Sequence, residues 1–242
     1  MADIVLVHGI TESKHSWDPL LPLLADHRVL AVDLRGHGAD RSGAPYDLGT
    51  MAGDVFAAMS VAGFAPETSV LVGHSLGGTV VSAMASSTGV GGVVNVDQPL
   101  DLASFQDGLR QLQPMLEGDE ASFRAAIGMV FDSMRGPLSA PEVARIEGLR
   151  DPRQEVVLAI WAPVLHASLD DLNALVSGMA SAIKVPYLSL HGIDPGPHYG
   201  DWLKRLIPSA TVEQWPDSGH YPHLVDPTRF VARLNAFVET LA

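Results

Sequence analysis

The sequence predicts an α/β fold, in which a mostly parallel sheet of about six strands carries helices on both faces. Short apolar runs rich in β-branched residues recur along the chain, and the first five are almost entirely apolar rather than alternating. Such runs are typical of strands whose two faces are both covered. Helical patterns lie between the early runs, and this βαβα order is typical of an α/β protein. The expected strands are residues 4–7, 29–32, 70–72, 93–96, 187–190 and 211–215.

Helices are expected between the first four strands, at residues 17–25, 51–62 and 76–87. The first of these expected helices has Asp18 and Pro19 near its start, and both residue types are typical of a first helical turn. A last helix is expected after the sixth strand, where Asp226 supplies an N-cap and Pro227 the first helical residue. These helices would cover the two faces of the sheet.

The interval between residues 100 and 183 interrupts this alternation, because it shows helix signals and no convincing strand. Residues that can cap helices recur within it, namely Asp101, Asp119, Ser139, Asp151 and Ser168. We therefore expect an all-helical lid, residues 100–183, inserted in an α/β core formed by residues 1–99 and 184–242.

The lid carries many apolar side chains, and they need a partner surface. The natural surface is the carboxyl edge of the sheet, where ligands bind in open α/β folds. Most of these side chains are expected to pack within the lid. Trp161, Met129 and Met134 are the candidates for lining a substrate pocket, because aromatic and methionine side chains adapt to irregular apolar ligands.

Composition and charge argue against several classes of function. The formal net charge of −13 disfavours nucleic acid and anionic membranes as partners. The chain has no cysteine, so it has no disulfide, thiolate nucleophile or cysteine metal site. No apolar run approaches the roughly 20 residues that span a bilayer, and the first strand begins at Ile4, which leaves no room for a signal peptide. We expect a cytoplasmic monomer or homodimer.

A serine between glycines follows the third expected strand. In the stretch VLVGHSLGG, Gly73 and Gly77 stand two positions on either side of Ser75. This GxSxG spacing is typical of a sharp strand-to-helix turn that holds a serine hydroxyl above the sheet, where a Cβ at either glycine would crowd the turn. Ser75 is therefore a candidate nucleophile.

Four motifs in order resemble the α/β-hydrolase family over nearly the whole chain. They are VLVHGI at 5–10, DLRGHG at 33–38, GHSLGG at 73–78 and DSGHYPH at 217–223. The resemblance implies an acyl-transfer site with a serine, a histidine and a carboxylate. It points to the same histidine as the chain order does, because His220 follows the last strand in a glycine-containing loop and can take the serine proton. His8, His74 and His191 are interpreted as groups that shape loops, and His223 as a surface residue.

Backbone N–H groups are expected to stabilise the oxyanion that forms during serine attack. One is the N–H of Leu76, at the start of the helix after the nucleophile, where the helix dipole also favours negative charge. The other is the N–H of Ile10, just after His8 and Gly9, with Thr11 as the alternative.

The carboxylate partner of His220 has two candidates. The family usually takes it from a sequence like HGxxD after the fifth of these strands, but in His191–Pro195 the aspartate, Asp194, comes one residue early. Some relatives take it from the end of the strand after the serine, which here is Asp97. Either would accept a hydrogen bond from the imidazole Nδ1.

The expected activity is hydrolysis of a carboxylic ester or lactone of a small, largely apolar substrate through an acyl-enzyme on Ser75. A serine at this position disfavours reactions that use an aspartate nucleophile. No metal or organic cofactor is required. Two alternatives remain open: a cofactor-free perhydrolase or acyltransferase, in which something other than water takes the acyl group, and a ligand receptor with slow turnover on the same fold.

Overall fold

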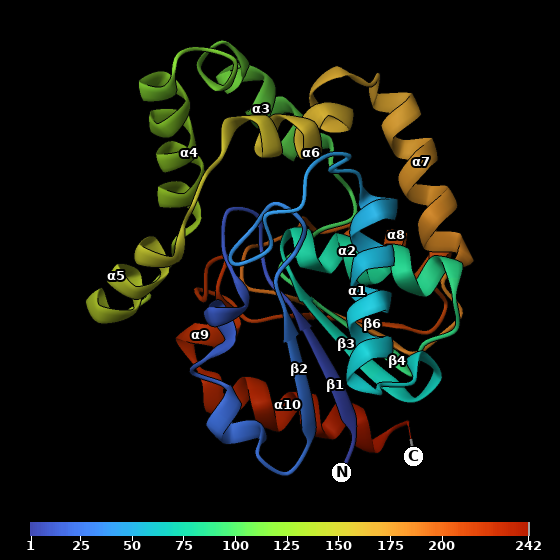
Figure 1. Cartoon of the computed structure of the whole chain (residues 1–242). Helices are drawn as coiled ribbons and strands as arrows, with labels where there is room; N and C mark the ends of the chain where they lie inside the picture. Colours follow the sequence, from blue (N-terminus) through green and yellow to red (C-terminus); the bar gives the residue numbers. More distant parts are fainter. Residues whose placement is uncertain (242) are drawn as a thin grey trace.

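The computed structural model describes residues 1–241, and their sheet has six parallel strands, which confirms the predicted fold class (Figure 1). Across the sheet the strands follow the order β2-β1-β3-β4-β5-β6. Their bounds are β1 Asp3–Val7, β2 Arg28–Val32, β3 Ser69–His74, β4 Gly92–Val96, β5 Tyr187–His191 and β6 Ala210–Gln214. The chain moves from β1 to one side and returns with β3 on the other. The β1–β3 boundary is thus the switch point at which α/β sheets place their ligands.

Both faces of the sheet are covered, and successive residues of each strand alternate between two apolar clusters. Val5 and Val7 pack on one face, whereas Ile4 and Leu6 pack on the other. The first face is covered by α1 Leu48–Ala62, α2 Leu76–Ser87, α7 Leu169–Ala182 and α8 Tyr199–Leu206. The second is covered by η1 Lys14–Trp17, η2 Leu21–Leu24, α9 Pro222–Val225 and α10 Pro227–Glu239. A further 3-10 turn, η3 Pro66–Thr68, precedes β3. None of the helices described here is long and apolar enough to cross a bilayer.

The prediction of an α-helix at residues 17–25 is wrong. The segment instead forms the two 3-10 turns η1 and η2. Pro22 lies in the middle of the expected helix, where it lacks the N–H of the helical ladder and its ring clashes with the carbonyl four residues earlier. The segment still buries Trp17, Leu20 and Leu24 against the sheet, so its apolar spacing serves the core without an α-helix.

Five helices and no strand lie between β4 and β5 in the described chain: α3 Ala103–Leu116, α4 Glu120–Met134, α5 Ala140–Leu149, α6 Gln154–His166 and α7. Figure 1 shows α3–α6 across the end of the sheet opposite the N-terminus, which is where β1 ends. We refer to residues 100–183 as the insert. Asp119, Ser139 and Ser168 cap α4, α5 and α7 as expected.

Two expected caps of the insert do not cap helices. The N-cap of α6 is Arg153, and Asp151 instead pairs with Arg41 at 2.7 Å. The N-cap of α3 is Leu102, although the Asp101 carboxylate accepts a hydrogen bond from the N–H of Ala103. The sequence spacing located these helices but misplaced their first residues.

The turn after α4 is packed directly on the loop that carries His220. The N–H of His220 donates to the carbonyl of Met134 at 2.8 Å. Gly136 and Gly219 both have positive φ, 65° and 59°, and a Cβ built on Gly136 would lie 2.6 Å from the Gly219 Cα. Neither glycine has room for a side chain. The insert is thus fixed to the core at the backbone of this loop.

Gly136→Ala is expected to destabilise the protein by at least about 1–3 kcal/mol, because the alanine would be held at positive φ against the Gly219 backbone. The matched control is Gly128→Ala in α4, where a Cβ meets nothing within 4 Å and alanine should stabilise the helix by roughly 0.5–1 kcal/mol. Urea unfolding of both variants checks this. Equal effects of the two substitutions would contradict it.

Candidate active site

Ser75 occupies a strained turn between β3 and α2. Its φ and ψ are 52° and −123°, in a region that residues with a Cβ rarely adopt. A Cβ on Gly73 would collide with the carbonyl of Gly77, and one on Gly77 with the carbonyl of Val7 in β1. The two glycines therefore allow β1, β3 and α2 to approach closely enough to form this turn, and the Ser75 side chain is left half-buried at its tip.

Two free backbone N–H groups flank Ser75. The N–H groups of Gly78 and Thr79 donate to the Ser75 carbonyl, but within residues 1–241 neither Leu76 nor Ile10 has an acceptor for its N–H. The turn before Ile10 lies beside the serine, since a Cβ built on Gly9 would be 3.3 Å from the Ser75 Cβ. This is the arrangement that an oxyanion site needs.

His220 and Asp97 form a buried hydrogen-bonded pair. The Nδ1–H of His220 donates to Asp97 Oδ2 at 2.6 Å, and the other carboxylate oxygen, Oδ1, accepts from the N–H groups of Gly192 and Ile193 at 2.7 and 3.0 Å. Asp97 follows β4 with a φ of 51°, which turns its side chain across the end of β5. The pair joins loops that are 123 residues apart in the sequence.

Asp194, the other candidate for the acid, lies elsewhere. It is exposed, and its Oδ1 accepts the N–H of Gly196 at 2.8 Å within its own loop. No hydrogen bond or ion pair joins it to His220 in the described chain. The loop after β5 thus contributes to the site through the N–H groups of Gly192 and Ile193, which bind Asp97, rather than through its own aspartate.

The pair is arranged to present an imidazole lone pair. Burial lowers the pKa of His220, while the bond to Asp97 opposes this. Burial would raise the pKa of Asp97, but the bonds from His220 and the Ile193 N–H lower it overall. Because the Nδ1–H donates a hydrogen bond to Asp97, the neutral ring has its lone pair on Nε2, which is buried and has no partner among residues 1–241.

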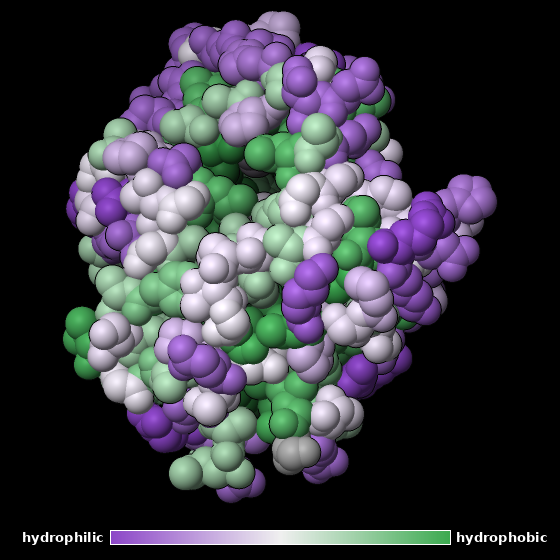
Figure 2. Space-filling model, turned by 90° about the vertical axis from the view of Figure 1, so that its right-hand side faces the viewer, coloured by the Kyte–Doolittle hydropathy of each residue, from purple (hydrophilic) through white to green (hydrophobic). Residues whose placement is uncertain are grey.

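An apolar wall formed by the insert packs on the side chains of the two residues whose N–H groups are free. Ile10 and Leu76 belong to the same cluster as Trp161, which is 6% exposed, and the half-buried Met134. Met129 is 54% exposed and lies outside this cluster. Met129 falls off the buried stripe of α4, which contains Phe123, Ile127, Val130 and Phe131, and its assignment to a substrate pocket stays a prediction. Figure 2 shows apolar residues around a hollow in the upper half of one face, at the height of the insert.

Sequence reasoning missed a second buried polar group beside His220. Glu12, His74 and Tyr221 are all buried, and the rings of His74 and Tyr221 lie 4.6 and 5.3 Å from that of His220. His223, interpreted as a surface residue, is fully buried, and its ring lies 4.6 Å from His74. The only signal for this group in the sequence is Glu12 itself, the last residue of VHGITE, which comes directly after the turn that carries Ile10.

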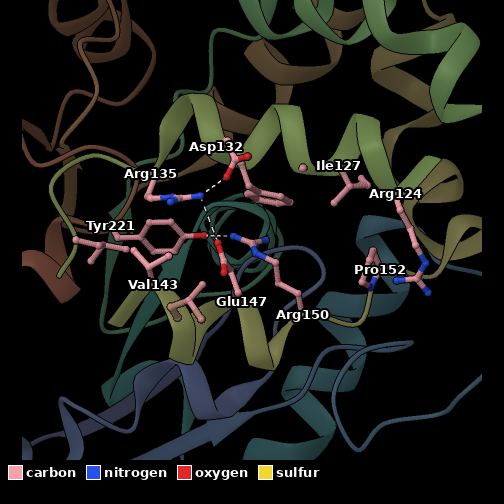
Figure 3. Close-up of a pocket in the computed structure, with 13 residues that line it drawn as sticks. Arg124, Ile127, Asp132, Arg135, Val143, Glu147, Arg150, Pro152 and Tyr221 are labelled. Carbon is pink, nitrogen blue, oxygen red and sulfur yellow. Dashed lines mark hydrogen bonds and ion pairs between the residues drawn. The ribbon is translucent and has the colours of Figure 1, made fainter. Parts of the chain in front are cut away.

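A pocket of about 350 Å³ between α4 and α5 reaches this second group (Figure 3). Tyr221 and Arg150 line it, and the Arg150 guanidinium donates to the Tyr221 hydroxyl and lies 3.4 Å from the centre of the Phe131 ring. Ser75 and His220 do not line the pocket. It is therefore a neighbour of the candidate active site rather than its substrate cavity. No group of three His, Asp or Glu side chains in the described residues could hold a metal ion.

The sequence profile of the alpha/beta hydrolase family matches residues 4–234. The chain belongs to this family. Pimeloyl-[acyl-carrier protein] methyl ester esterase of Pectobacterium carotovorum subsp. carotovorum (strain PC1) is 29% identical, over 98% of this chain and 94% of that protein. The magnesium-chelatase 30 kDa subunit of Rhodobacter capsulatus is 32% identical, over 92% and 81%. An esterase from Rhodococcus sp. ECU1013 is 28% identical and superposes with a TM-score of 0.70, over 100% of this α/β-hydrolase and 91% of that chain.

Buried neutral histidines should make this α/β-hydrolase less stable in acid. Burial lowers the pKa of His37 and of His191 from 6.5 to about 4. Between these values the unfolded chain binds more protons than the native one. Stability is therefore lost as the pH falls from about 6.5 to about 4, by up to about 1.4 kcal/mol per pH unit for each histidine.

Urea unfolding across this pH range measures that slope. In His37→Asn the side-chain amide can still donate to the Arg35 carbonyl, which accepts from His37 Nδ1 in the wild type. The variant should lose the part of the pH dependence of unfolding free energy that His37 contributes. The exposed His166→Asn serves as a control for the replacement itself. The same slope in His37→Asn as in the wild type would contradict the assignment to His37.

Proposed function

We propose that this α/β-hydrolase hydrolyses carboxylic esters through an acyl-enzyme on Ser75. One observation carries the proposal: Ser75 stands at a strained turn beside two free N–H groups, and His220, held by Asp97, offers an unpartnered Nε2 in the same buried region. A nucleophile, a base with an orienting carboxylate and an oxyanion site are the parts that acyl transfer requires.

The proposed reaction has two halves. His220 Nε2 takes the proton of the Ser75 hydroxyl while the Ser75 oxygen attacks the ester carbonyl carbon. The oxyanion that forms accepts hydrogen bonds from the N–H groups of Ile10 and Leu76. The intermediate collapses, the C–O bond to the alcohol breaks, and His220 gives its proton to the departing alcohol. Water then attacks the acyl-enzyme with His220 again as base, which releases the acid and restores Ser75. Asp97 stabilises the imidazolium in both halves.

The substrate class that we propose is a small, largely apolar ester or lactone. The apolar wall of Trp161 and Met134 supports it, since these side chains pack beside Ile10 and Leu76, where the substrate carbonyl would lie. Two of the relatives named above are called esterases, whereas the Rhodobacter capsulatus protein is called a magnesium-chelatase subunit. In this proposal the insert is the lid. The cytoplasmic location and the choice between monomer and homodimer stay predictions.

Ser75→Ala should reduce steady turnover of a p-nitrophenyl ester to the background rate, a loss on the order of 10⁶-fold, because no other group forms the acyl-enzyme. Ser60→Ala, at an exposed position of α1, is the matched control. Full esterase activity in Ser75→Ala would overturn the proposal. In the wild type, a single burst that then stalls would favour the slow-turnover receptor, and transfer of the acyl group to an added nucleophile in preference to water would favour the acyltransferase.

Asp97→Asn and Asp194→Asn distinguish the two candidate acids. Each substitution keeps the shape of the side chain and removes its charge. Asp97→Asn should lower kcat by roughly 10³- to 10⁴-fold, since it removes the acceptor that fixes the His220 tautomer, whereas Asp194→Asn should leave kcat within about twofold. Steady-state kinetics on both variants checks this, and equal losses in the two would show that the Asp97 assignment is wrong.

A further inference from the structure

Two buried polar atoms without hydrogen-bond partners face each other beside the candidate active site. They are Glu12 Oε2 and His74 Nδ1, 3.8 Å apart, on side chains that are each 1% exposed. His74 is next to Ser75 in the chain, and Glu12 follows the turn that carries Ile10. A buried carboxylate oxygen without a partner is costly, so this juxtaposition needs an explanation.

The other nitrogen of His74 decides which atoms can carry protons. Nε2 lies 2.8 Å from the carbonyl oxygen of His220, and because a carbonyl only accepts, Nε2 holds a hydrogen. If His74 were neutral, the Nδ1 lone pair would face the carboxylate oxygen of Glu12, and two acceptors would oppose each other. A proton on Nδ1 removes this conflict, because it makes His74 a cation that faces the carboxylate.

We propose that Glu12 is a positioning residue of this active site, whose carboxylate forms an ion pair with a protonated His74 and thereby fixes the His74 ring that holds the backbone of His220. The protonation of this pair is independent of the reaction, whereas its effect on catalysis rests on the proposed ester hydrolysis.

The groups around Glu12 are arranged to keep it ionised. Its Oε1 accepts the Tyr221 hydroxyl at 2.9 Å, and that hydroxyl in turn accepts from Arg150, whose guanidinium is 3.9 Å from the carboxylate. Burial alone would raise the pKa of Glu12, but the facing His74 and Arg150 lower it well below its ordinary value, and His8 contributes in the same direction.

Arg150 brings the insert into this network. It follows α5 in sequence, and its Nη1 donates to the hydroxyl of Thr11, the residue after Ile10, at 3.0 Å. The N–H of the next residue, Asp151, donates to the Thr11 carbonyl at 2.8 Å. The charge that balances Glu12 thus comes from the insert and arrives at the turn that supplies an oxyanion N–H.

The pair also sets the electrostatic surroundings of His220. The His74 ring lies 4.6 Å from that of His220, and Tyr221 and His223 face His74 from the last loop and α9. A positive charge on His74 lowers the pKa of His220, and the more distant Glu12 raises it by less. The charged pair therefore keeps His220 unprotonated and able to act as the base.

Imidazole ¹⁵N NMR of the wild-type protein, labelled at histidine, tests the protonation directly. The His74 signals are assigned with His74→Gln. We expect both nitrogens of His74 to carry a hydrogen in the native protein near neutral pH, because Nε2 donates to the His220 carbonyl and Nδ1 faces the Glu12 carboxylate. A neutral His74 protonated only at Nε2 would overturn the proposal, whatever the esterase activity proves to be.

Glu12→Gln tests the effect on His220. With the carboxylate removed, His74 should become neutral, and the acidic limb of the kcat/KM profile should move to higher pH because the positive charge that lowers the pKa of His220 is lost. Glu12→Asp keeps the charge and should retain the wild-type limb, as should the exposed control Glu67→Gln. An unmoved limb, or one moved to lower pH, in Glu12→Gln would overturn the proposal. If Glu12→Gln does not fold, the wild-type spectrum decides.

Discussion

The close approach of three backbones, those of β1, β3 and α2, is the constraint on which the candidate active site depends. Gly73 and Gly77 allow it, because each leaves space for a carbonyl that a Cβ would displace. The approach brings the end of β1, with the Ile10 N–H, beside Ser75, and it exposes the first N–H of α2 at the same point. One steric condition therefore places both the proposed nucleophile and its proposed oxyanion donors.

Charge balance is the second condition, since the site buries several ionisable groups in a small volume. Asp97 is ionised and satisfied by His220 and two N–H groups, so it leaves no free oxygen. With the proposed proton on His74, the two carboxylates Asp97 and Glu12 are balanced by His74 and Arg150 while His220 is neutral. Proton uptake by His220 then adds one positive charge opposite the negative charge that develops on the oxyanion, which limits the electrostatic cost of the reaction.

The fold and the serine could be predicted from sequence because local sterics determine them. Apolar runs predict strands, and the glycines around Ser75 predict the turn. The acid could not be chosen, because the choice between Asp97 and Asp194 depends on how two loops from different strands meet. A hydrogen bond between residues 123 positions apart leaves no local trace. Glu12 was missed for the same reason, since its partners come from β3, the last loop and the insert. Met129 lies outside the buried stripe of α4, so its place in a substrate pocket stays a prediction.

The attachment of the insert limits how a substrate could enter. The turn after α4 is fixed at Gly136 and by the hydrogen bond between Met134 and His220, and the end of α5 is fixed through Arg150 on the turn after β1. Movement of either contact would disturb the histidine loop or the oxyanion turn. Opening of the site is therefore expected in α3 and α6, which pack on each other around Trp161 rather than on the histidine loop, whereas α7 is held against α2 on one face of the sheet. On this argument the α4–α5 region is part of the framework of the proposed active site, and α3 and α6 are the helices that would act as a lid in the proposed hydrolase.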